Sequence, residues 1–147
     1  MGGYRVLELK NIVKKYNTGG SEVEVLKSVN IHFRENEFVS ILGASGSGKT
    51  TLLNIIGGLD KYTSGDMALM GRSTKEFKDR DWDSYRNGTI GFVFQSYNLI
   101  SHLSIIENVK LALSISGQSN AENDEKSKKV LEDVGLAEHL YTKPNQL

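Results

Sequence analysis

Residues 38–56 read FVSILGASGSGKTTLLNII and carry the strongest structural signal in the chain. Phe38–Leu42 is a short, mostly apolar run, which is typical of a strand buried on both faces of a parallel sheet. Gly43–Gly48 is too rich in glycine for a helix or a strand. From Thr50 to Ile56 the leucines and isoleucines recur at helical spacing, and Gly57-Gly58 is a stop signal. The stretch therefore predicts a strand, a glycine loop and a helix.

The loop Gly43-x-x-x-x-Gly48-Lys49-Thr50 has the spacing of a phosphate-binding loop. Glycines let successive backbone N–H groups turn inward around an anion, and the helix that follows adds its unpaired amides and positive dipole end. We expect the Lys49 ammonium on the β- and γ-phosphates and the Thr50 hydroxyl on Mg²⁺. The alternative is an ordinary glycine-rich turn. The predicted phosphate-binding residues are Gly43, Ser45, Gly46, Ser47, Gly48, Lys49, Thr50 and Thr51.

Length and composition exclude several classes of protein. A chain of 147 residues is the size of one domain. Its 18 Lys and Arg balance its 18 Asp and Glu, so no overall positive field attracts nucleic acid, and no nucleic-acid partner is expected. The absence of cysteine excludes disulfides, a thiolate nucleophile and cysteine-ligated zinc. No signal peptide or run of roughly 18 apolar residues is present, so we expect a soluble cytoplasmic domain.

An antiparallel β layer is predicted before the loop. Apolar and polar residues alternate over residues 6–13 and 23–33, and residues 17–21, NTGGS, supply turn chemistry between them. In the second stretch the odd positions are expected to share one face, namely Val23, Val25, Val29, Ile31 and Phe33.

Five further elements are predicted after the loop and its helix. They are a strand over residues 67–70, a helix over 74–86, an apolar strand over 90–94, a helix over 105–116 and a helix over 121–134. The strand over 90–94 ends on the polar Gln95. Ser104 and Glu107 form a capping box, in which both side chains satisfy backbone amides at the start of the next helix.

From Leu7 to Leu147 the chain resembles the ATP-binding subunit of ABC transporters. The stretches LGASGSGKTTLLNIIGGLD, TSGD, IGFVFQSYNLI and LSIIENV look closest to the branch that exports macrolides, antimicrobial peptides and lipoproteins. The resemblance implies an α/β fold, a P-loop NTPase core of the ABC type with the antiparallel β layer and part of a helical subdomain. Residues 1–96 would hold the β layer, phosphate loop and glutamine loop, and residues 97–141 the helical subdomain.

The same resemblance implies roles and partners. Tyr16 falls where the family stacks an aromatic ring on adenine, although a tyrosine that caps a strand end is the alternative. Gln95 falls where the family has a glutamine that reaches Mg²⁺ and the attacking water, although a polar strand end is the alternative. Lys49 and Gln95 are thus the expected catalytic residues, with ATP and Mg²⁺ as cofactors. The expected partners are a transmembrane permease subunit, on the inner face of the cell membrane, and a second ATP-binding subunit in a homodimer.

Some positions depart from the family pattern. Tyr62 stands where the family usually has proline, and Ser101 precedes His102 where it often has proline. Residues 144–147, PNQL, end on what resembles the first residue of the family's signature, Leu-Ser-Gly-Gly-Gln. The rest of that signature, a run of four apolar residues that ends in Asp-Glu and the family's later switch histidine are not present. His32, His102 and His139 are instead expected to be surface or strand residues.

We therefore expect the front part of an ATPase, with the C-terminal part of the core missing. The alternative is a nucleotide-binding fragment that does not hydrolyse ATP by itself. Phe38–Leu42 would lack its neighbouring strands, which favours strand exchange, oligomerisation or marginal stability. A nucleotide kinase is a weaker interpretation because about forty residues precede the loop. A GTPase is weaker still because no Asn-Lys-x-Asp motif is present.

Overall fold

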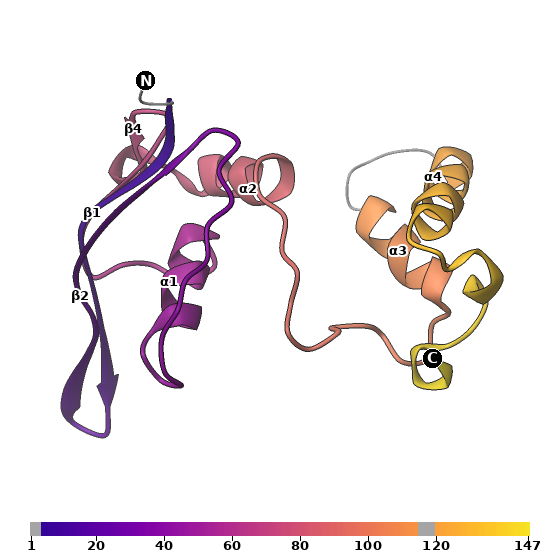
Figure 1. The fold of residues 1–147 in the computed structure, drawn as a ribbon, viewed down its shortest axis with the longest axis horizontal. Coiled ribbons are helices and arrows are strands. Elements are labelled where there is room, and N and C mark those ends of the chain that lie inside the picture. Colours follow the sequence, from indigo (N-terminus) through magenta and orange to yellow (C-terminus); the bar gives the residue numbers. More distant parts are fainter. Residues whose placement is uncertain (1–3, 115–119) are drawn as a thin grey trace. The chain divides into compact units, whose positions relative to one another are not determined.

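The computed structural model describes residues 4–114 and 120–147 and divides into two compact units, residues 1–92 and 93–147 (Figure 1). The first unit contains β1 (Arg5–Thr18), β2 (Ser21–Arg34), α1 (Lys49–Ile56), β3 (Ser64–Leu69), β4 (Arg72–Ser73), η1 (Thr74–Glu76) and α2 (Asp79–Gly88). The second contains α3 (Ile105–Ser114), α4 (Asn120–Asp133), η2 (Ala137–His139) and η3 (Pro144–Gln146). Within the described residues, no helix has the length and apolar character needed to cross a membrane.

The predicted antiparallel β layer is confirmed. One sheet has the strand order β2-β1-β3-β4, and every pair in it is antiparallel. The β1–β2 hairpin closes at the pair Thr18 and Ser21, where Gly19 and Gly20 turn the chain with φ of 58° and 87°. The turn chemistry at residues 17–21 therefore acts as the sequence predicts.

The prediction that the odd residues of β2 all share one face is wrong. Between the pairs Ile12–Val29 and Lys14–Leu26, β2 has one more residue than β1, and Ser28 in this bulge has a φ of 55°. The extra residue reverses which positions face the core. Leu26 is therefore 5% exposed, whereas Val23 is 50% exposed.

The core of the first unit lies between the sheet and α1. Leu9, Ile12 and Met67 come from the strands and are at most 1% exposed. Ile55 of α1, also 1% exposed, belongs to the same cluster. Helix α1 begins at Lys49, one residue before the predicted start at Thr50. It ends at Ile56, directly before Gly57, as predicted.

The helix predicted over residues 74–86 is interrupted. Phe77 and Lys78 are extended, with ψ of 130° and 169°, so η1 ends before them and α2 begins after them. Two side chains then fasten α2 to the end of α1. The buried Tyr85 hydroxyl donates to the Ile56 carbonyl at 2.6 Å, and Arg86 donates to the Gly58 carbonyl at 2.8 Å.

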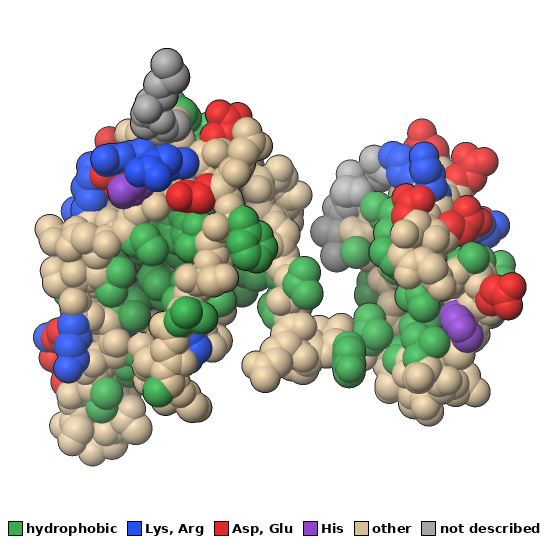
Figure 2. Space-filling model, viewed as in Figure 1, with side chains coloured by type: hydrophobic (Ala, Val, Ile, Leu, Met, Phe, Trp, Pro, Cys, Tyr) green, Lys and Arg blue, Asp and Glu red, His purple; other side chains and the backbone are tan. Residues whose placement is uncertain are grey.

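The strands predicted over residues 38–42 and 90–94 are not formed. An extended apolar segment becomes a strand only where neighbouring strands accept and donate its backbone hydrogen bonds. Phe38–Leu42 makes no hydrogen bond within the described part of the chain, and Phe38 and Leu42 are 96% and 90% exposed. Figure 2 shows hydrophobic side chains gathered on the visible surface of the first unit. The parallel pairing expected for Phe38–Leu42 is thus absent among the described residues.

The second unit confirms its two predicted helices. As the capping box predicts, the Ser104 amide donates to the Glu107 carboxylate at 2.7 Å, and the Glu107 amide donates to Ser104 Oγ at 3.4 Å. The Ser104 hydroxyl also donates to this carboxylate at 2.6 Å. Helix α3 runs to Ser114, and the remaining two residues of the predicted helix lie outside the described residues. Ile106 and Leu131 form the core between α3 and α4. As predicted, His32 lies in β2 and His102 and His139 are exposed.

Candidate nucleotide-binding site

Gly48 joins the glycine loop to α1 in a conformation that only glycine adopts without strain. Its φ is 89°, in the left-handed region, and it is the N-cap residue of α1. A Cβ at this position would lie 3.0 Å from Leu26 Cδ2 and 3.2 Å from Val25 Cγ1. The loop can therefore approach β2 this closely only because Gly48 has no side chain.

The Lys49 ammonium lies within the bend of the loop. It donates to the carbonyl oxygens of Gly43 and Ala44 at 2.7 and 2.6 Å and lies 3.4 Å from Ser47 Oγ. A Cβ on Gly43 would come within 2.5 Å of that Ser47 oxygen, so the bend is tight. The loop thus holds a positive point charge at its centre.

The N-terminus of α1 is electropositive. No side chain caps it, and its first turn contains no acidic residue. The first amides of a helix have no partner within the helix, and the helix dipole adds positive potential there. Together with Lys49, these amides give a locally electropositive surface that suits an anion, in a chain whose net charge is zero.

Thr50 is the one predicted metal ligand in this unit. It is exposed in the first turn of α1, and its hydroxyl makes no hydrogen bond within the described residues. Hard cations such as Mg²⁺ prefer oxygen ligands, and Mg²⁺ is usually bound by few protein groups together with substrate phosphates. No group of three or more His, Asp or Glu residues in the described ranges could hold a metal by itself. The Thr50 hydroxyl therefore fits Mg²⁺ only as part of a shared site with phosphate oxygens.

Tyr16 lies near the same end of the sheet as the loop. It pairs with Val23 across the hairpin, and Val25, two residues further along β2, contacts Gly48. The Tyr16 side chain is partly exposed, at 39%. Tyr16 and Gly48 thus lie beside nearby residues of the same strand, β2.

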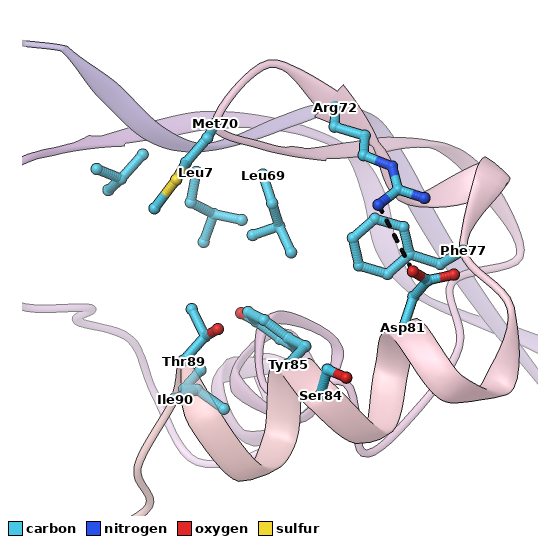
Figure 3. Close-up of a pocket in the computed structure, with 11 residues that line it drawn as sticks. Leu7, Leu69, Met70, Arg72, Phe77, Asp81, Ser84, Tyr85, Thr89 and Ile90 are labelled. Atoms are coloured by element: carbon cyan, nitrogen blue, oxygen red, sulfur yellow. Dashed lines mark ion pairs between the residues drawn. The ribbon is translucent and has the colours of Figure 1, made fainter.

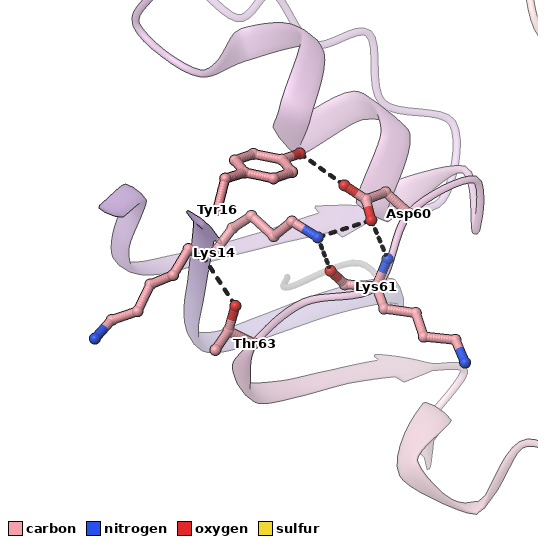
Figure 4. Close-up of polar contacts among 6 residues, drawn as sticks. Lys14, Tyr16, Asp60, Lys61 and Thr63 are labelled. Carbon is pink, nitrogen blue, oxygen red and sulfur yellow. Dashed lines mark hydrogen bonds and ion pairs between the residues drawn. The ribbon is translucent and has the colours of Figure 1, made fainter. Parts of the chain in front are cut away.

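A polar network that the sequence did not reveal surrounds Tyr16 (Figure 4). The Tyr16 hydroxyl donates to Asp60 Oδ2 at 2.7 Å, and Lys14 Nζ donates to Asp60 Oδ1 at 2.7 Å. Partial burial favours protonation of Asp60, but hydrogen bonds from Lys14, Tyr16 and the Lys61 amide outweigh it and hold the pKa of Asp60 below its ordinary value. Asp60 is therefore ionised near neutral pH.

The second unit contains Gln95. This residue is exposed and follows the segment that was predicted as a strand. The family resemblance implies that Tyr97, Asn98, Leu99 and Leu103 lie near a partner groove, with plain packing of the subdomain as the alternative. Tyr97 and Leu99 are 90% and 43% exposed, and Leu103 is half-buried. Their roles remain predictions.

An apolar cavity of about 510 Å³ also lies in the first unit, between α2 and the strands β1 and β3 (Figure 3). Arg72 forms an ion pair with Asp81 at 3.5 Å at this cavity and lies over the Phe77 ring. None of the predicted phosphate-binding residues lines it. The phosphate loop is thus an open site on the surface, separate from this cavity.

A glycine loop whose bend holds a lysine ammonium, followed directly by an uncapped helix, is the arrangement of a P-loop protein. The chain belongs to the ABC transporter family, because the model of the family described as "ABC transporter" matches residues 26–147. The resemblance found in the sequence is therefore confirmed.

Relatives of known name agree with this assignment. The lipoprotein-releasing system ATP-binding protein LolD of Alcanivorax borkumensis is 41% identical over 97% of this chain and 62% of the relative. The macrolide export ATP-binding/permease protein MacB of Hyphomonas neptunium is 39% identical over 97% of this chain and 22% of the relative. The chain thus spans less than two thirds of the length of these relatives.

The fold matches a solved ATP-binding cassette. The structure of MJ0796, described as a dimeric, post-hydrolysis state bound to ADP and Pi, superposes with a TM-score of 0.84 at 41% identity. The match covers 96% of this chain and 62% of the MJ0796 chain. The predicted ABC-type α/β fold class is confirmed, although the two strands over residues 38–42 and 90–94 are not formed.

Proposed function

We propose that this chain provides the ATP-phosphate site of an ATPase subunit that drives export through an ABC transporter. The observation that carries the proposal is the Lys49 ammonium held inside the glycine loop at the uncapped start of α1. Such a site suits a polyanion rather than a neutral ligand. The name of MacB, a macrolide export protein, supports export as the process that the ATPase serves, and the name of LolD specifies a lipoprotein-releasing system.

Each residue of the site has a proposed role. Backbone amides from Ser45 to Thr51 and the Lys49 ammonium hold the β- and γ-phosphates, and Tyr16 stacks on the base. Thr50 and Gln95 would hold Mg²⁺, which, when bound, neutralises charge on the phosphate oxygens. Gln95 also orients the attacking water. Lys49 acts in catalysis because its charge stabilises the phosphoryl group during transfer.

Two partners are proposed. The first is a second ATP-binding subunit, since the related MJ0796 cassette was solved as a dimer. The second is a transmembrane permease, since MacB combines ATP-binding and permease functions in its name. The subunit would then act at the cytoplasmic face of the membrane through this permease.

Calorimetric titration of the full chain with Mg-ATP tests the phosphate site. We expect binding by the wild-type chain and an affinity about 10- to 100-fold lower for Lys49→Ala, because a charge-assisted contact is lost. Lys75→Ala, a change at an exposed lysine of η1, is the matched control and should bind as the wild type does. Absence of binding to the wild-type chain, or wild-type affinity in Lys49→Ala, would contradict the proposal.

Phosphate release measured in the same samples tests hydrolysis separately. Release that depends on Lys49 would support an ATPase. Binding without release would favour the alternative, in which this chain holds ATP but does not hydrolyse it by itself.

A further inference from the structure

Asp60 is fixed to the end of the phosphate-loop helix. The chain leaves α1 at Gly57, and the amides of Leu59 and Asp60 both donate to the Asn54 carbonyl, at 2.8 and 3.2 Å. Asn54 lies within α1. The Asp60 backbone therefore follows any displacement of the helix that begins at the phosphate loop.

The Asp60 carboxylate has three donors. Its Oδ2 accepts the Tyr16 hydroxyl at 2.7 Å, and its Oδ1 accepts Lys14 Nζ and the Lys61 amide, both at 2.7 Å. Figure 4 shows the Tyr16 hydroxyl directed at this carboxylate. The side chain of Asp60 thus connects the end of α1 to strand β1.

Lys14 holds the Tyr16 ring at a second point. The Lys14 residue is 8% exposed, and its ammonium also donates to the Lys61 carbonyl at 2.6 Å. The same ammonium lies 4.7 Å from the centroid of the Tyr16 ring, over one face. With its hydroxyl bonded and one face against a cation, the ring has a fixed orientation, and Tyr16 is still 39% exposed.

We propose that Asp60 is a positioning residue that fixes the Tyr16 ring for base stacking and links it to the phosphate-loop helix. This inference rests on the proposed function, because Tyr16 must stack on the nucleotide base. A ring that is already oriented loses less side-chain freedom on binding, so more of the stacking energy appears as affinity. Asp60 acts only through Tyr16 and does not touch the phosphates.

The test compares two probes, Mg-ATP and Mg-tripolyphosphate, which share phosphates but differ in the base. Calorimetric dissociation constants are measured for the full wild-type chain, Tyr16→Phe, Asp60→Ala and the double variant. Tyr16→Phe keeps the stacking ring and removes only the hydroxyl. We expect it to weaken ATP binding about two- to fivefold, because one hydrogen bond orients the ring, and to leave tripolyphosphate binding unchanged.

Asp60→Ala should weaken ATP binding at least as much, again without affecting tripolyphosphate. Adding Tyr16→Phe to Asp60→Ala should cause no further loss, because the hydroxyl acts only through the carboxylate. Since Asp60→Ala leaves the buried Lys14 ammonium without its carboxylate, a thermal melt must first show that it folds. If Asp60→Ala does not fold, Tyr16→Phe alone tests whether the hydrogen bond between Tyr16 and Asp60 contributes to ATP affinity. Asp66→Ala, which removes another half-buried aspartate with one side-chain donor, is the control.

Three results would overturn the inference. The first is wild-type ATP affinity in Tyr16→Phe, and the second is an equal loss for both probes, which would indicate a structural role. The third is a wild-type chain that binds tripolyphosphate as tightly as ATP. This result would show that the base contributes nothing to affinity, although the phosphates still bind. If the wild-type chain binds neither probe, the proposed function itself fails.

Discussion

At the scale of single residues, Gly48 is the position where backbone conformation and close packing coincide. We expect Gly48→Ala to lower the free energy of unfolding by about 1–3 kcal/mol, because a left-handed φ opposes a Cβ and the Cβ meets β2. Gly46 separates the two causes, since it has a φ of 77° but nothing within 4 Å of its Cβ position. Gly46→Ala should therefore cost less in urea unfolding, and equal losses for the two variants would contradict this explanation.

Asp60 predicts a pH dependence of stability. Hydrogen bonds hold its folded pKa below the unfolded value, so its contribution is present above about pH 4 and is lost as the pH falls through the folded pKa. Urea unfolding is measured at a series of decreasing pH values. Below about pH 4, the urea concentration at the unfolding midpoint should decrease more for the wild type than for Asp60→Asn. A variant with the full wild-type pH dependence would show that other carboxylates are responsible.

Residue-scale chemistry was predictable from the sequence only where it is local. The phosphate loop lies within eight consecutive residues, so its spacing is visible as a motif. Asp60 is separated from Lys14 by 46 residues and from Tyr16 by 44. Only the packing of the α1 end against β1 brings these groups together, and no pattern along the chain encodes that approach.

At the scale of elements, the capping box determines how well α3 is anchored. We expect Ser104→Ala to destabilise the second unit by about 0.5–2 kcal/mol. The mutation removes the hydroxyl that donates to the Glu107 carboxylate and accepts from the Glu107 amide. Amide hydrogen exchange of α3 residues measures the change. Ser114→Ala, at the other end of α3, removes an exposed hydroxyl that, among the described residues, donates to the Lys110 carbonyl, and it should have a smaller effect. Equal effects of the two changes would contradict the role of the cap.

Elements that depend on their own residues were predicted well. Helix α1 and the β1–β2 hairpin follow from periodicity and turn residues. The β2 bulge was not predictable, because Ser28 is an ordinary residue whose φ of 55° arises from pairing with β1. The strand expected at Phe38–Leu42 could not be predicted from its own residues either. An apolar run predicts burial, but the run becomes part of a sheet only where neighbouring strands pair with it.

At the scale of the whole molecule, the first unit exposes an extended apolar segment. Phe38 and Leu42 lie on the surface at 96% and 90% exposure, and the segment between them has no hydrogen bonds within the described residues. Hydrophobic side chains are visible on this unit in Figure 2. Free backbone groups beside apolar side chains are a template for pairing with another chain.

We therefore expect the wild-type chain to self-associate as its concentration rises. Phe38→Lys should shift sedimentation velocity profiles towards monomer, because pairing two copies of the segment would then bring like charges together without burying a phenyl ring. Val134→Lys is the control, since Val134 is 65% exposed but follows α4 and offers no extended segment. A wild-type chain that is monomeric at every concentration, or equal dissociation by both variants, would show that Phe38–Leu42 does not mediate association.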